Sequence, residues 1–186
     1  MSQSRQRLDP EARRRQLIDL AMQVFATDGL ERAGHGDIAK LAGVSTATVF
    51  NYFPTREDLV EAVLEEVREQ FRAMFAAFGD VKTEQAIGVR VMVAGFNHLI
   101  ENRPNMIKTF LRWTVAFGDQ NRKAYLDFQD EMLTEISKRL KNSTPDRSDA
   151  RIIMGSADMY ALMKLDNTPD DVIARFVDRL LSVLGE

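Results

Sequence analysis

The spacing of apolar residues is the feature that most constrains the fold of this chain. Apolar residues recur three and four positions apart along nearly the whole sequence, and no run alternates as in a half-buried strand. Four of the five prolines (Pro10, Pro54, Pro104 and Pro169) stand where a helical segment begins. The pattern therefore predicts an all-α fold of about nine helices. The expected helices cover approximately residues 10–28, 36–41, 46–52, 55–78, 83–102, 104–117, 121–141, 149–165 and 170–184.

Two of these segments have expected positions in the fold. The longest begins at Thr55-Arg56-Glu57-Asp58, which is typical of a capping box with Asp58 in the place of the usual Glu. At about 24 residues it would be about 36 Å long, so we expect it to connect two lobes. The segment Val89–Phe96 is apolar nearly all round and predicts a central, buried helix.

Composition excludes several classes of protein. The 186 residues are 45% hydrophobic and 28% charged, which is typical of a globular protein. No apolar stretch approaches the roughly 18 residues that a membrane span needs. The first residues lack the apolar core of a secretory signal, so we expect neither a membrane segment nor a signal peptide. Because the chain has no cysteine and only two histidines, we expect no metal site and no cofactor.

Charge is concentrated unevenly along the chain. The net charge is −3, but the first fifteen residues hold five arginines, among them Arg5 and Arg7, against two acidic residues. That end is therefore locally +3, and the remaining 171 residues sum to −6. The asymmetry indicates a local basic surface rather than a uniformly basic protein.

The segment of residues 36–52 has the order of a helix-turn-helix. A short helix is followed by the turn Ala42-Gly43-Val44 and by a second short helix with Ser45 as its N-cap. This second helix carries small or polar side chains in its first turn, so it can approach base edges in a DNA major groove closely. An Asn side chain can pair with adenine, and Ala or a Thr methyl group can contact a thymine methyl group. The arginine-rich end fits a basic arm beside such a reading helix.

Three passages make this pattern specific: Arg5-Gln6-Arg7-Leu8, Ala33–Ala39 and Ala47–Val60. On these residues the chain resembles the TetR family of transcriptional regulators. Within the family it is most similar to the quorum-sensing master regulators of the HapR, SmcR and vibrio LuxR type. The resemblance covers residues 5–67 and is faint beyond them. It implies a cytoplasmic, bacterial, nucleoid-associated homodimer, with a DNA-binding domain over residues 1–54 and a dimerisation and ligand-pocket domain over residues 55–186.

The resemblance also assigns roles in DNA binding. Thr46, Ala47 and Asn51 would face base edges, and Arg5 and Arg7 would form an arm in the minor groove. Many relatives have Tyr where this chain has Phe50, which would make apolar contact with a base instead of bonding a phosphate. His35 has two interpretations, phosphate contact or packing. The residues expected to hold phosphates are Ser45, Thr48, Tyr52, Thr55 and Arg56.

The C-terminal half has enough aromatic and Met residues to line an apolar cavity for a small ligand, although a packed core is the simpler interpretation. Trp113 is the strongest candidate, because in the resembled subgroup a Trp on the equivalent helix lines the pocket. His98 and Asn97 could accept a hydrogen bond from its indole. The predicted pocket residues are Phe75, Phe78, Met92, Phe96, Trp113, Phe117, Phe128 and Met132.

The last two predicted helices are apolar over more surface than one short lobe needs. Gly155, Ser156 and Ala157 would allow close approach of another helix. We therefore expect a four-helix bundle formed by two subunits, with capping of the lobe's own core as the alternative.

These observations favour a sequence-specific DNA-binding regulator that acts as a homodimer on a roughly palindromic operator. A ligand-responsive repressor of a neighbouring efflux or metabolic operon is the alternative within the family. A helical enzyme is disfavoured, because no acid–base pair and no Gly-rich phosphate loop is recognisable. A dimer that has lost DNA binding is disfavoured by the intact arm and reading helix.

Overall fold

The computed structural model describes residues 9–32, 34–79, 85–116, 118–140 and 143–184 and contains nine α-helices within these ranges. The all-α prediction is confirmed. No helix in the described ranges combines the length and the apolar character that crossing a membrane would need. The helices are α1 (Pro10–Asp28), α2 (His35–Ala42), α3 (Thr46–Tyr52), α4 (Arg56–Ala77), α5 (Gln85–Asn102), α6 (Pro104–Thr114), α7 (Asp119–Arg139), α8 (Ser148–Leu165) and α9 (Asp170–Leu184).

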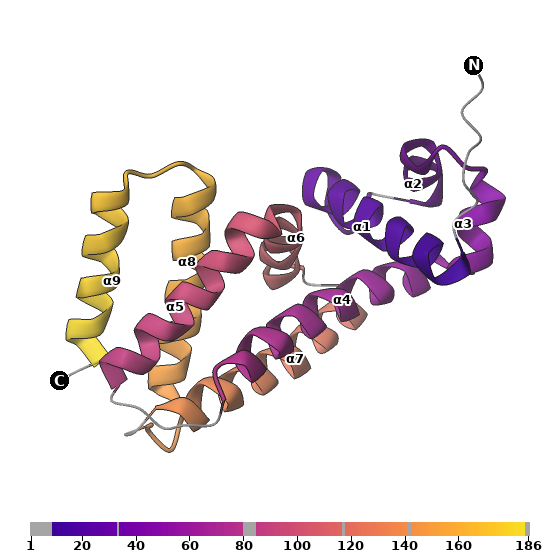
Figure 1. Cartoon of the computed structure of the whole chain (residues 1–186). Coiled ribbons are helices and arrows are strands. Elements are labelled where there is room, and N and C mark those ends of the chain that lie inside the picture. The colour runs from indigo at the N-terminus through magenta and orange to yellow at the C-terminus, as the bar shows by residue number, and fades with distance from the viewer. Residues whose placement is uncertain (1–8, 33, 80–84, 117, 141–142, 185–186) are drawn as a thin grey trace.

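Helices α1 to α3 form a small head at the N-terminal end of the molecule (Figure 1). Asp9 caps α1 by accepting the Ala12 N–H at 2.8 Å, and α1 ends at Gly29, whose φ of +87° suits glycine. The head packs around fully buried Leu17 and Phe25. Burial of such side chains is the main stabilising contribution in a domain of this size.

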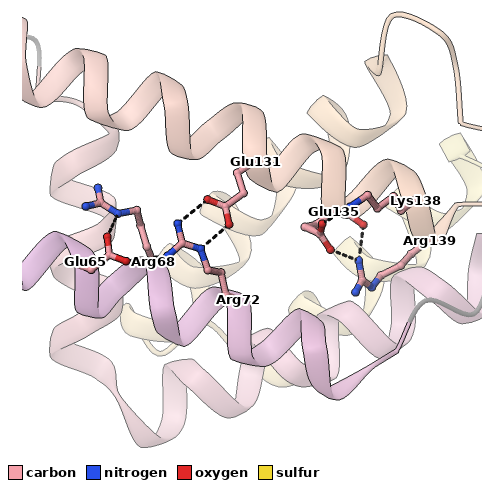
Figure 2. A network of polar contacts seen from close by, with 7 residues as sticks. All are labelled: Glu65, Arg68, Arg72, Glu131, Glu135, Lys138 and Arg139. Atoms are coloured by element: carbon pink, nitrogen blue, oxygen red, sulfur yellow. Dashed lines mark hydrogen bonds and ion pairs between the residues drawn. The ribbon is translucent and has the colours of Figure 1, made fainter.

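Helix α4 runs out of the head and into the second lobe, where α7 lies alongside it (Figure 1). Arg72 of α4 donates to both carboxylate oxygens of Glu131 of α7, at 2.6 and 2.9 Å (Figure 2). Arg139 of α7 donates to the Phe75 carbonyl of α4 at 2.8 Å. These bidentate and buried contacts fix the two long helices in register. The predicted connecting helix and its capping box, with Asp58 at the fourth position, are confirmed.

Helix α6 joins the head to the lobe by packing against the C-terminal end of α1. Its Arg112 donates to the Ala26 and Thr27 carbonyls at 3.0 and 2.9 Å, and buried Thr109 donates to the Met22 carbonyl at 3.1 Å. The Ala26 and Thr27 carbonyls lie in the last turn of α1 and lack partners within the helix, so the positively charged Arg112 satisfies them and interacts favourably with the helix dipole.

Helices α8 and α9 lie antiparallel at the end of the molecule remote from the head, with α5 beside them (Figure 1). The predicted central position of α5 agrees with its contacts to four other helices, but its burial is one-sided: Val89, Met92 and Phe96 are buried, whereas Ile87 and Val91 are 52% and 40% exposed. The reason is that α4, α6, α8 and α9 cover one side of α5, and its other side faces outward.

Candidate DNA-binding interface and ligand cavity

The turn between α2 and α3 sets the angle at which α3 leaves the head. Gly43 has a φ of +63°, in the left-handed region that favours glycine, and its N–H closes the end of α2 on the Lys40 carbonyl at 3.3 Å. Ser45 then caps α3 by accepting the Thr48 N–H at 3.1 Å. The sequence pattern predicted both the turn and the cap, and the structure confirms them.

Helix α3 is held to the head through one face only. Val49 is fully buried, and His35 bonds the Phe53 carbonyl through Nε2 at 2.7 Å. The His35 ring also stacks on the Phe50 ring, with 4.0 Å between the ring centroids and 9° between the ring planes. Of the two interpretations of His35, the geometry therefore favours packing, because the imidazole contacts the Phe50 ring and the Phe53 carbonyl.

The opposite face of α3 is open to solvent. Thr46, Ala47 and Asn51 are exposed, and Phe50 is 45% exposed beside them. The Asn51 carboxamide makes no hydrogen bond to any residue in the described part of the chain. Small side chains and a free amide on one face are the groups that direct readout in a major groove needs.

The residues predicted to hold phosphates differ in whether their hydrogen-bond donors are already engaged within the protein. The Ser45 and Thr48 hydroxyls bond each other at 2.8 Å, so one of the two hydroxyl hydrogens remains free to donate. Thr55 donates to Asp58 at 2.7 Å, which leaves its hydroxyl no hydrogen for a phosphate, and the Arg56 guanidinium donates to the Leu30 carbonyl. Tyr52 is half-buried. Arg5 and Arg7 lie outside the described residues.

A cavity of about 70 Å³ lies inside the second lobe, between α4, α5, α6, α7, α8 and α9. Its wall is almost wholly aromatic and aliphatic. Five of the predicted pocket residues line it: Phe75, Met92, Phe96, Phe128 and Met132.

The other three predicted pocket residues do not line it within the described structure. Trp113 is fully buried one layer behind the wall, stacked on Phe128 at 5.3 Å, and its indole N–H donates to the Asn121 carbonyl at 3.0 Å instead of to His98 or Asn97. Phe78 lies against Gly95 of α5, outside the cavity wall. Phe117 lies outside the described residues. Trp113 and Phe78 are therefore packing residues here: the Phe128 ring stands between Trp113 and the cavity, and Phe78 packs on Gly95.

Asp158 of α8 also lines the cavity, and the sequence analysis missed it. Its Oδ1 atom is buried and has no hydrogen-bond partner. Burial raises the pKa of Asp158 to about 6. Tyr125 of α7 faces it: burial, and after it the Asp158 charge, raise the pKa of Tyr125. The available signal was position, because residue 158 lies four after Met154 and three before Ala161 on an otherwise apolar helix face.

We expect Asp158→Asn to stabilise the protein at pH 7.5 by about 1–3 kcal/mol. The folded pKa is raised above the ordinary value of 3.8, so the ionised carboxylate destabilises the fold above pH 6 and protonation relieves this as pH falls. The advantage of the variant should fall to about half at pH 5. Urea denaturation at both pH values measures it, with Asp166→Asn at the exposed end of α8 as the matched control. If the stability difference between Asp158→Asn and the unmodified protein were the same at both pH values, the account of Asp158 would be wrong.

The outer faces of α8 and α9 carry an exposed apolar stripe. Ile152, Met159 and Leu162 lie on one face of α8, and Val172 and Val183 lie on α9. Exposed apolar side chains that gather on two adjacent helices are typical of a protein interface.

The head has the arrangement of a helix-turn-helix, and an all-α lobe follows it. A model of the bacterial regulatory proteins of the tetR family matches residues 17–63, which cover most of the head and the start of α4. Over these residues the chain is similar to this family.

Two curated relatives are similar to the chain over longer stretches. The HTH-type transcriptional regulator LuxR of Vibrio harveyi is 39% identical over 116 residues, which are 62% of this chain and 57% of that relative's length. The nicotine-responsive transcriptional repressor HdnoR of Paenarthrobacter nicotinovorans is 28% identical over 96% of this chain and 99% of its own. Among solved structures, a TetR-like transcriptional regulator from Rhodococcus sp. RHA1 covers 96% of both chains with a TM-score of 0.79 at 19% identity.

Proposed function

We propose that the protein is a sequence-specific DNA-binding transcriptional regulator that acts as a homodimer on a roughly palindromic operator. Residues 1–54 form the DNA-binding domain and residues 55–186 the dimerisation and ligand-pocket domain in this proposal. The observation that carries it is the solvent-facing side of α3, where Thr46, Ala47 and the unbonded Asn51 amide stand together.

The proposed division of labour follows from these contacts. Phosphate contacts fix the position of a protein on DNA, and a few base contacts specify the sequence. Ser45 and Thr48 retain a donor for a phosphate, and the Arg56 guanidinium keeps further N–H donors beside the one that bonds Leu30, whereas Thr55 would first have to release Asp58. Arg5 and Arg7 remain proposed for the minor groove.

The apolar stripe on α8 and α9 supports dimerisation through these two helices. A single head offers too small a surface for tight selective binding. A two-fold dimer presents two copies of α3, with centres about 34–36 Å apart or a multiple of that distance.

Selection of DNA from a genomic library by the purified protein tests the proposal. We expect enrichment of one palindrome, bound with an affinity that falls steeply as the salt concentration rises. Binding without enrichment of any sequence, or no binding at all, would overturn it.

Asn51→Ala should weaken binding to the selected operator by about 1–3 kcal/mol and relax the preference at one base position in each half-site. The physical reason is that only the carboxamide can pair bidentately with adenine. Fluorescence anisotropy against operators substituted at each position measures both effects. Arg56→Ala is the contrast, since loss of a phosphate contact weakens all sequences alike. Unchanged affinity and preference in Asn51→Ala would exclude base reading by this residue.

Two finer functions are supported by different observations. Similarity to the vibrio LuxR protein over the N-terminal part supports a quorum-sensing master regulator. The cavity, together with similarity to a nicotine-responsive repressor over nearly the full length, supports a ligand-responsive repressor of a neighbouring operon. Mapping of bound sites across the genome separates them, because a master regulator occupies many promoters and a local repressor occupies the promoter of its neighbour.

A further inference from the structure

The cavity wall contains three polar side chains among otherwise apolar ones: Ser156, Asp158 and Tyr160. The Tyr160 hydroxyl is already engaged, because it donates to Asn97 Oδ1 at 3.0 Å. Among the described residues of the wall, Asp158 alone is charged, and its buried Oδ1 atom lacks a partner. Among the ion pairs of the described residues, Asp158 takes part in none.

This carboxylate is costly in the absence of a partner. With a pKa of about 6 it is mostly ionised at neutral pH, and a partly buried charge without a counter-ion destabilises the fold. Nothing in the fold requires a carboxylate there, since the positions before and after it on the same face of α8, Met154 and Ala161, are filled by apolar side chains. The Asp158 carboxylate lowers the stability of the fold and lines a cavity, so a role in binding a ligand explains it better than a role in packing.

The rest of the wall is suited to a cation. Phe71, Phe75, Phe96, Phe110, Phe128 and Phe176 all contribute to it. Aromatic faces attract an organic cation electrostatically, and the attraction is strongest when the site is dry. A carboxylate in an aromatic cavity therefore offers an ammonium group both a counter-ion and π faces, whereas a neutral apolar ligand would leave the charge unpaired.

We propose that this cavity binds a small organic cation, an ammonium group with apolar substituents, and that the Asp158 carboxylate is its counter-ion. The inference rests on the proposed role of the C-terminal lobe as a ligand-binding unit, and it specifies the ligand class.

The dimensions of the cavity limit the size of the ligand. Its volume of about 70 Å³ is roughly half that of an engineered protein cavity that admits benzene. The cation is therefore compact, with few heavy atoms. Met74, Met92, Met132 and Met154 line the same space, and their flexible side chains allow modest enlargement on binding.

The test compares tert-butylammonium with tert-butanol, which has nearly the same shape but no charge. Methyl NMR of the full-length protein, labelled at methionine, follows binding at the four lining Met residues. We expect the cation to shift these signals saturably, with an affinity about tenfold or more above that of the alcohol. In Asp158→Asn this preference should fall to within about twofold. In Asp166→Asn, which removes an exposed charge from the same helix, it should be unchanged.

Three results would overturn the inference: equal affinity for the two probes, a preference that survives in Asp158→Asn, or no saturable shift at tens of millimolar cation. The comparison of the two probes on the unmodified protein does not depend on how any variant folds. Operator binding is measured on the same samples. If the protein binds the operator but not the cation, this inference alone is rejected. If it binds the cation but no operator, the proposed DNA-binding function alone is rejected.

Discussion

Met159→Glu should leave the protein monomeric and lower its operator affinity by a factor of about 100 or more. Met159 is 50% exposed at the centre of the apolar stripe of α8 and α9, between Ile152 and Leu162. In a two-fold interface the substitution occurs twice, and each copy would bury an unpaired carboxylate against apolar side chains. Monomeric heads would then bind half-sites independently and lose the gain that comes from joining them.

Analytical ultracentrifugation and fluorescence anisotropy measure the two parts of this prediction. Leu126→Glu is the matched control, because Leu126 is 45% exposed on α7 and lies outside the proposed interface. This control should remain dimeric and bind the operator normally. A dimeric Met159→Glu protein with unchanged operator affinity would show that α8 and α9 are not the interface.

Trp113→Ala should lower the free energy of unfolding by about 3–5 kcal/mol. The indole is fully buried, stacked on Phe128, in edge contact with Tyr125 at 5.8 Å, and under the Arg68 guanidinium at 5.7 Å. Its removal leaves a large void and removes the hydrogen bond from the indole N–H to the Asn121 carbonyl. The large effect is expected because Trp113 belongs to the core of the lobe and not to the wall of the cavity.

Urea denaturation followed by circular dichroism measures this loss at a fixed protein concentration, because dimerisation also contributes to stability. Val115→Ala, at a side chain that is 65% exposed, should change stability by less than about 0.5 kcal/mol. A loss of under about 1 kcal/mol in Trp113→Ala would mean that the lobe tolerates the void and that Trp113 is not a core residue.

Helix starts can be predicted from the sequence where a proline or a capping side chain marks them. Pro10, Pro104 and the Thr55–Asp58 box mark the first residues of their helices because each acts through its own backbone or an immediate neighbour. Gly43 and Ser45 likewise mark the turn and the N-cap of the helix-turn-helix. The predicted helix over residues 104–117 is longer than α6, which ends at Thr114, because no glycine or capping side chain marks that end in the sequence.

Side-chain roles inside the lobe were harder to predict, because periodicity gives a face of a helix but not the neighbour that covers it. Phe128 and Trp113 both point inward, yet Phe128 lines the cavity and Trp113 lies behind it. Asp158 gave no signal because an acidic residue on a helix is usually solvated, and only the packing of the lobe buries its Oδ1 atom. These outcomes depend on how the helices pack, which local sequence does not specify.

The most direct test of the central claim is methylation protection of guanine N7 on the selected operator, which reports contacts in the major groove. If two α3 helices held by joined lobes enter successive turns, protection should fall in two clusters related by two-fold symmetry. Their centres should lie about 34–36 Å apart, or a multiple of that distance, on one face of the DNA. A single protected cluster, or two clusters on opposite faces, would contradict the account.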